Sequence, residues 1–263
     1  MSIFQAVLLG IVQGLTEFLP VSSSGHLNII PWFFGWTTIP ESFDVALHAG
    51  TLLALLIYFF KDWIQLLKGA YLSVFKKEKN IDGKIFWYLV MATIPSGLIG
   101  YLLDKYFEEI LTKPIVIAIS LIVMGIILYF VDKIAKSDVD LEHMSLKQAI
   151  VIGMSQILAF IPGVSRSGIT ITTARAFKLN RESAARYSFY LSAPIVFAAT
   201  VLKVSEFEYT LAFGLGVLTS FLVGLLVISI MMKYLKKGSY MPFAIYRVIF
   251  GCVIIAKLIM MIK

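Results

Sequence analysis

Two short segments of this chain combine Ser, Gly and Pro with side chains that can do chemistry. Residues 13–26 read QGLTEFLPVSSSGH and residues 162–170 read PGVSRSGIT. The first segment contains a carboxylate at Glu17, hydroxyls at 22–24 and an imidazole at His26. A hydroxyl is a nucleophile once a base activates it, and imidazole moves protons near neutral pH. The first segment is therefore typical of nucleophilic or acid–base chemistry.

The second segment indicates anion binding. Arg166 carries a planar fork of donors that suits phosphate oxygens, and hydroxyls and loop amides flank it. The serines of the first segment precede an apolar restart, where a helix N-terminus exposes free amides. An Arg166–Glu17 ion pair of purely structural use is the alternative. The residues expected to bind phosphate are Ser22, Ser24, Gly25, Ser165, Ser167, Gly168 and Thr170.

Glu17 is a carboxylate among apolar neighbours, so its charge needs a cation, a metal ion or water. Gln13 lies four residues earlier, on the same helix face. We expect both to bind metal, with Glu17 also suited to acid–base work; a neutral Glu17 that locks two helices is the alternative. His48 is expected to be structural, and Arg247 to extend toward lipid headgroups.

The elements that position these residues are membrane helices. Hydrophobic residues make up 59% of the 263 residues and charged residues 15%, far from the composition of a soluble domain. A helix that spans a bilayer needs roughly 20 apolar residues. Six runs meet this need, at 43–60, 85–103, 114–131, 184–202, 210–232 and 243–262. The single cysteine, Cys252, excludes an intrachain disulfide, and the +7 charge lies mostly in short loops, so nucleic acid is not an expected partner.

The two chemical segments are copies of each other. Without any gap, residues 10–25 match residues 153–168 at seven of sixteen positions. Three of the runs lie between the copies, and an odd number of crossings inverts the second copy. We therefore predict an all-α polytopic membrane protein, a single integral membrane domain over 1–263. It has six full transmembrane helices and two re-entrant broken-helix segments, in inverted repeats at approximately 1–131 and 146–263. In such folds both breaks meet at one site near the membrane midplane.

Lysines and arginines gather in loops 61–84, 175–186 and 233–237, which predicts that these loops are cytoplasmic and that both termini are outside.

The quoted motifs resemble the two signatures of the undecaprenyl-diphosphate phosphatase family of the bacitracin-resistance type, and PFAIYR at 242–247 resembles its C-terminal signature. The similarity covers essentially the whole chain. It implies a hydrolase of the bacterial cytoplasmic (inner) membrane whose active site opens to the outer face. This enzyme would remove the terminal phosphate of undecaprenyl diphosphate, recycling the lipid carrier for peptidoglycan synthesis and conferring bacitracin resistance.

The resemblance also implies a divalent cation, Mg²⁺ or Ca²⁺. In the acidic motif of the family the first position is Glu or Gln; Gln13 stands there, so Glu17 carries the carboxylate role alone and the metal count stays open. Ser23 is the expected nucleophile, with His26 as general base and Arg166 neutralising the transferred phosphoryl group. His26 as nucleophile, or a water activated by the metal on Glu17, are alternatives.

A second hypothesis is a flippase that moves the lipid headgroup through the same midplane cavity, since transporters share this architecture. Ser23 and His26 favour the phosphatase, because a transporter needs neither a nucleophile nor a proton shuttle. Membrane lipids are the expected surroundings, and a homodimer is an arrangement that the sequence leaves open.

Overall fold

The computed structural model describes residues 1–37 and 39–262, except for the side chains at 101, 103–110 and 262. Within this part every extended element is a helix, and an isolated bridge joins Val139 to Leu179. The helices of the first half are α1 (Ile3–Glu17), α2 (Ser23–Phe34), α3 (Glu41–Tyr58), α4 (Phe60–Phe75), α5 (Ile81–Leu111) and α6 (Pro114–Ile134). Those of the second half are α7 (Leu146–Ser155), the 3-10 turn η1 (Gln156–Phe160), α8 (Arg166–Ala176), α9 (Arg181–Lys203), η2 (Val204–Glu206), α10 (Leu211–Leu235) and α11 (Met241–Ile262).

Five stretches are long and apolar enough to cross a membrane: α3, α6, α9 with η2, α10 and α11. Each contains most of a run predicted from the sequence. The sixth predicted run, 85–103, lies inside α5, and its side chains at 101 and 103 fall outside the described part. Large apolar side chains are exposed on the surface of the five helices, as a lipid solvent requires. The prediction of an all-α, multi-pass membrane protein is confirmed.

Both chemical segments break a helix in the same way. Pro20 follows the end of α1, and proline disfavours a helical conformation in the residue before it. Ser22 then adopts a φ of 75° and its Oγ atom caps α2 by accepting from the Gly25 amide at 3.2 Å. Ser165 has a φ of 73° and its Oγ atom caps α8 through the Gly168 amide at 3.0 Å. A positive φ is strained for serine, so the surrounding structure must hold both turns.

The matching caps lie 143 residues apart, the same offset as the sequence repeat. The offset extends to the start of each broken segment, where Ser2 with Gln5 and Ser145 with Gln148 form capping boxes. Packing is reciprocal as well, because α1 packs against α10 of the other half and α7 packs against α5. These features agree with an inverted repeat, which stays a prediction.

Glycines bring these helix pairs close together. A Cβ atom at Gly10 of α1 would lie 2.4 Å from the Gly216 carbonyl oxygen of α10, and one at Gly153 of α7 would lie 2.4 Å from Cβ of Ala92 in α5. Membrane helices associate through such small residues because lipid provides no hydrophobic drive between them. The close approach of α1 to α10 and of α7 to α5 fixes the depth at which α1 and α7 end.

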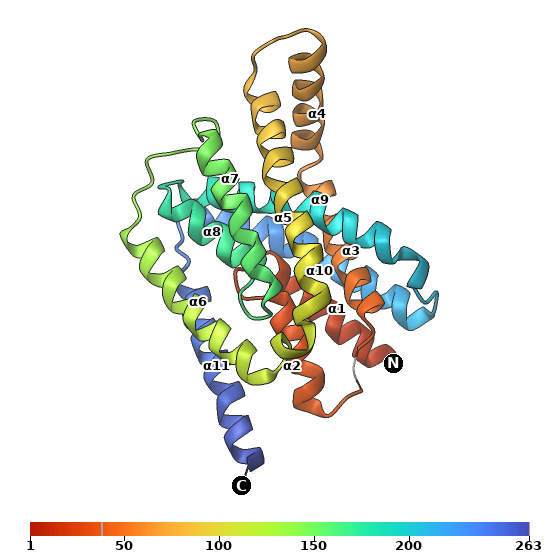
Figure 1. Ribbon diagram of the computed structural model, residues 1–263. Coiled ribbons are helices and arrows are strands. Elements are labelled where there is room, and N and C mark those ends of the chain that lie inside the picture. The colour runs from red at the N-terminus through yellow and green to blue at the C-terminus, as the bar shows by residue number, and fades with distance from the viewer. Residues whose placement is uncertain (38, 263) are drawn as a thin grey trace.

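The two broken segments meet in the interior of the molecule, while α4 and the start of α5 extend from one end as a hairpin (Figure 1). The Gly163 amide donates to Ser22 Oγ at 3.1 Å, and the Ser167 hydroxyl donates to the Leu19 carbonyl at 3.2 Å. The largest buried apolar cluster draws on α3, α5, α7, α8, α9 and α10. The ends of four half-helices therefore share one place beside this core.

Candidate active site

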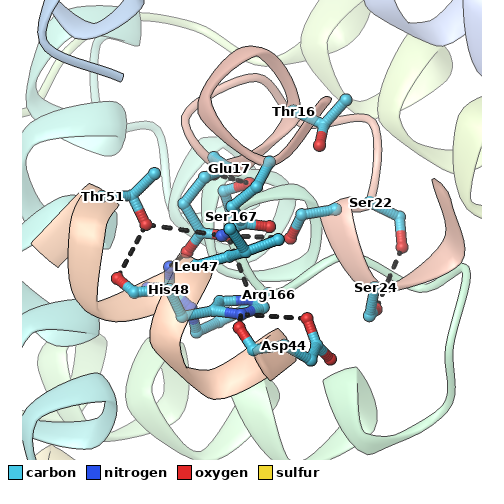
Figure 2. A network of polar contacts seen from close by, with 12 residues as sticks. Thr16, Glu17, Ser22, Ser24, Asp44, Leu47, His48, Thr51, Arg166 and Ser167 are labelled. Carbon is cyan, nitrogen blue, oxygen red and sulfur yellow. Dashed lines mark hydrogen bonds and ion pairs between the residues drawn. The ribbon is translucent and has the colours of Figure 1, made fainter. Parts of the chain in front are cut away.

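Glu17, the last residue of α1, is the centre of the site and is 7% exposed. Its Oε1 atom accepts from Nη2 of Arg166, the first residue of α8, at 2.5 Å. Its Oε2 atom accepts from the Ser23 hydroxyl at 2.7 Å and from Nε2 of Gln13 at 3.1 Å. Figure 2 shows Arg166 and Glu17 lying together with residues of α3. The carboxylate thus joins a hydroxyl of the first segment to the guanidinium of the second.

Arg166 keeps part of its binding capacity free. One nitrogen, Nη2, is used by Glu17, whereas the buried Nη1 has no hydrogen-bond partner among the described residues. The residue lies at the wall of a cavity of about 580 Å³. A guanidinium that is half occupied by a carboxylate can turn its other donors to a phosphate without losing its support.

The cavity has a polar side and an apolar side. Residues of α2, α3 and α8 give it hydroxyl, amide, carboxylate, imidazole and guanidinium groups, whereas η1, the turn after it and α9 give it mainly aliphatic and aromatic groups. The polar residues are Ser24, Asn28, Glu41, Asp44, His48, Thr112 and Arg166; the apolar ones include Ile157, Leu158, Phe160, Ile161, Ile195 and Val196. Such a cavity suits an amphiphile with an anionic head and a hydrocarbon tail.

His48 of α3 belongs to this site, although its place near the outer end of a span predicts a structural role. Its Nε2 atom lies 3.5 Å from Glu17 Oε2, and its Nδ1 atom lies 2.9 Å from the Asp44 carbonyl and 3.4 Å from the Asp44 carboxylate. The signal for this in the sequence is that Asp44, His48 and Thr51 follow the spacing of one helix face. The imidazole that lies beside Glu17 is thus that of His48.

His26 lies elsewhere, which corrects its expected contact with Ser23. Its Nδ1 atom is 2.7 Å from the Ser22 carbonyl oxygen, and its Nε2 atom is 2.7 Å from the Tyr246 hydroxyl. The ring stacks on Phe250 of α11 with centroids 4.4 Å apart. Because both ring nitrogens are engaged between α2 and α11, His26 supports the turn rather than contacting the Ser23 hydroxyl.

Several residues expected to bind phosphate make hydrogen bonds within the protein. The hydroxyls of Ser22 and Ser165 accept from the amides of Gly25 and Gly168, and Ser167 donates to Leu19. Thr170 donates to the Arg166 carbonyl at 2.7 Å. These groups build the two turns. Of the expected set, Ser24 lines the cavity, and the first amides of α2 have no carbonyl within their own helix.

Oxygen donors for a divalent cation are present around Glu17. The Oε1 atom of Gln13 is buried and has no hydrogen-bond partner among the described residues, while Gln13 Nε2 contacts Glu17 and, at 3.4 Å, Thr51. Among those residues no group of three or more His, Cys, Asp or Glu is placed to hold a metal ion. Mg²⁺ commonly binds one or two carboxylates and completes its shell with water and phosphate oxygens, which fits this donor set.

Comparison with known proteins gives a consistent result. The model of the family described as bacitracin resistance protein BacA matches residues 6–253. An undecaprenyl-diphosphatase of Moorella thermoacetica is 45% identical over 259 residues, which cover 97% of this chain and 98% of that protein. Undecaprenyl-diphosphatases of Pelotomaculum thermopropionicum and Caldicellulosiruptor bescii are 45% and 46% identical, over 97% of this chain and 96% and 97% of their own length.

Proposed function

This chain belongs to the bacitracin resistance protein BacA family, and we propose that it hydrolyses undecaprenyl diphosphate to undecaprenyl phosphate and inorganic phosphate. The enzyme recycles a lipid carrier of cell-wall synthesis and thereby gives resistance to bacitracin. The observation that carries the proposal is the contact of the Ser23 hydroxyl with Glu17, whose other oxygen holds Arg166 beside a cavity that is apolar on one side.

The reaction begins with the diphosphate in the cavity and the prenyl chain along its apolar side. Glu17 takes the proton of the Ser23 hydroxyl, and the serine oxygen attacks the terminal phosphorus. The bond between this phosphorus and the bridging oxygen breaks, so undecaprenyl phosphate leaves and a phosphoserine remains. Water then attacks the phosphoserine, the serine oxygen leaves with a proton, and inorganic phosphate is released. Direct attack by water, with Ser23 only a ligand, is the alternative.

Arg166 and the helix ends stabilise the charge of the transferred group. The guanidinium supplies donors to the phosphoryl oxygens, and the N-termini of α2 and α8 add partial positive charge. Glu17 holds Arg166 in place between turnovers. Phosphoryl transfer depends mainly on such positioning and electrostatic stabilisation.

His48 replaces His26 as the proton carrier of the proposal. Its contact with Glu17 Oε2 allows it to receive the proton that this carboxylate accepts, and Asp44 orients the ring from its other nitrogen. The same group can return a proton when the phosphoserine is hydrolysed.

Glu17 and Gln13 are the residues that would hold a divalent cation, Mg²⁺ or Ca²⁺, next to the phosphates. When bound, such an ion neutralises negative charge on the oxygens of the transferred group.

The setting is the bacterial cytoplasmic membrane, with the cavity open to the outer face. The cavity contains Glu41, Asp44 and His48 from the first two turns of α3, while the lysine-rich 61–84 stretch follows the opposite end of α3. The preference of Lys and Arg for the cytoplasmic side supports this orientation. The expected homodimer stays a prediction, and light scattering of the protein in detergent tests it.

The deciding experiment is phosphate release from undecaprenyl diphosphate by purified protein in detergent, with and without divalent cation. Ser23→Ala should lower kcat by about 10³-fold or more, because it removes the nucleophile. Ser73→Ala is the matched control and should retain activity, because it removes a serine hydroxyl of α4 that donates to the Ala70 carbonyl. Mass spectrometry after rapid quenching should find phosphate on Ser23.

Release without phosphoserine and with an active Ser23→Ala protein would select direct attack by water. A folded wild-type protein that releases no phosphate would refute the enzymatic proposal and favour the flippase.

A further inference from the structure

Arg247 of α11 is fully buried, at 0% exposure. Its place near the start of the last span predicted that it extends toward lipid headgroups, and this prediction was wrong. Its guanidinium binds backbone carbonyls only. Nη1 donates to Pro20 at 3.1 Å, Nη2 donates to Gly163 and to Val164 at 2.8 Å each, and Nε donates to Leu121 at 3.4 Å. One side chain therefore holds the turn before α2 and the turn before α8 at once.

A second buried arginine shows how unusual this is within the chain. Arg175 of α8 is 1% exposed and pairs with the carboxylate of Asp132 at 2.8 Å. For Arg247 the described residues provide no ion pair, although a buried charge without a counter-ion is costly. The hydrogen bonds to the four carbonyls must compensate the cost of burying the charge. We therefore expect the guanidinium to have a role that a neutral side chain does not fulfil.

The neighbouring residues make room for this guanidinium. A Cβ atom at Gly168 would lie 2.6 Å from Arg247 Nη1, so glycine is the residue that fits there without displacing the fork. Both turns that Arg247 holds are followed at once by strained serines, Ser22 with a φ of 75° and Ser165 with a φ of 73°. Strained backbone of this kind persists only where the surroundings fix it.

The two reacting groups come directly after these turns. Ser23 follows the carbonyl of Pro20 by three residues, and Arg166 follows the carbonyl of Val164 by two. Their meeting point is Glu17, at 2.7 Å from the Ser23 hydroxyl and 2.5 Å from Arg166. The separation of the two turns thus sets the geometry of the site.

We propose that Arg247 is a positioning residue of the reaction, which joins the two turns through their carbonyls so that Ser23, Glu17 and Arg166 meet. The inference rests on the proposed hydrolysis. It requires the forked shape of the guanidinium and not its charge alone, because an ammonium group is a single point that cannot span the carbonyls of two turns.

The test compares Arg247→Lys with Arg175→Lys, since both keep the charge and both replace a buried arginine. Arg247→Lys should lower kcat for phosphate release by about 100-fold, the cost of a misplacement of roughly 1 Å. Its KM should change little, because the cavity that takes the lipid is intact. Arg175→Lys, on a helix end away from the cavity, should lower the melting temperature and leave kcat within about threefold.

Hydrogen–deuterium exchange provides a readout that does not depend on activity. In Arg247→Lys the amides of 18–25 and of 161–168 should both exchange about tenfold faster than in the wild type, while those of α4, which does not contact Arg247, stay unchanged. In Arg175→Lys the two turns should keep their wild-type exchange.

Unchanged exchange of both turns in Arg247→Lys, or a kcat within about threefold of the wild type, would overturn the proposal. If the turns exchange faster in Arg247→Lys but the wild-type protein itself releases no phosphate, Arg247 still holds the two turns, and the proposed hydrolysis is refuted instead. Should Arg247→Lys fail to fold, Gly168→Ala displaces Nη1 without removing the guanidinium, and it should speed exchange of the same two turns.

Discussion

Replacing Glu17 by Gln keeps the shape of the side chain and removes its charge, which separates its two roles. An amide oxygen still accepts the hydrogen bond that Ser23 gives to Oε2 at 2.7 Å, but it does not take the proton. A positioned general base contributes about 10²- to 10⁴-fold to a rate. The barrier should therefore rise by about 3–5 kcal/mol, at 1.36 kcal/mol for each factor of ten in kcat.

The same change frees Arg166. A hydrogen bond to a charged group contributes about 1.5–3 kcal/mol, and the partial exposure of Arg166, 16%, places its contact with Glu17 at the low end of this range. About 1.4 kcal/mol corresponds to a factor of ten. Inorganic phosphate should therefore inhibit Glu17→Gln at a roughly tenfold lower concentration than it inhibits the wild type.

The assay is phosphate release at a series of inorganic phosphate concentrations. Asp62→Asn is the control, because it removes a carboxylate that pairs with Arg186 at 2.7 Å, on α4 and away from the cavity. It should leave both constants close to the wild type. A Glu17→Gln protein with a kcat within about tenfold of the wild type and unchanged inhibition by phosphate would refute the reasoning.

Four further outcomes are expected. His48→Ala should lower kcat by about 10²-fold with little change in melting temperature. His26→Ala should lower both kcat and melting temperature, because it removes hydrogen bonds that hold a turn, and the reverse pattern would restore His26 as the proton carrier. Gly14→Ala should destabilise the protein by about 1–3 kcal/mol, since its Cβ would lie 2.8 Å from a backbone nitrogen of α10, while Gly97→Ala, with no described atom within 4 Å, should be tolerated in a thermal melt. A chelator should abolish phosphate release, with Mg²⁺ or Ca²⁺ restoring it, and full activity in excess chelator would exclude the cation. A cysteine at the exposed Lys77 should react with an impermeant reagent only from the cytoplasmic side, and labelling from outside would invert the proposed topology.

The sequence by itself determined the class of the molecule and the positions of its breaks. In lipid the backbone of a long apolar run is satisfied within a helix, and Pro20 with the serines and glycine that follow it predicted a break in the first segment. The repeat at an offset of 143 residues predicted that two turns of the same kind exist. Glu17 and Arg166 stood out because charges inside apolar runs need partners, and in the structure they are partners of each other.

Only the tertiary structure decided which residues complete the site. His48 becomes a neighbour of Glu17 because of the rotation and depth of α3 beside α1, and no local pattern fixes these. The opposite holds for His26, which is in the right sequence motif but faces Tyr246 of α11. Arg247 has the sequence context of an interfacial residue, yet α6 and both turns enclose it.

The physical reason is the range of the interactions. Periodicity, proline and caps act within about one helical turn, so they can be read along the chain. The facing of one helix toward another depends on how glycines such as Gly10 and Gly153 let helices of the two halves approach, and these contacts join residues far apart in the sequence. The chemistry that the motifs supply could therefore be predicted from the sequence, whereas the positions of His48 beside Glu17 and of Arg247 between the two turns were set by helix packing.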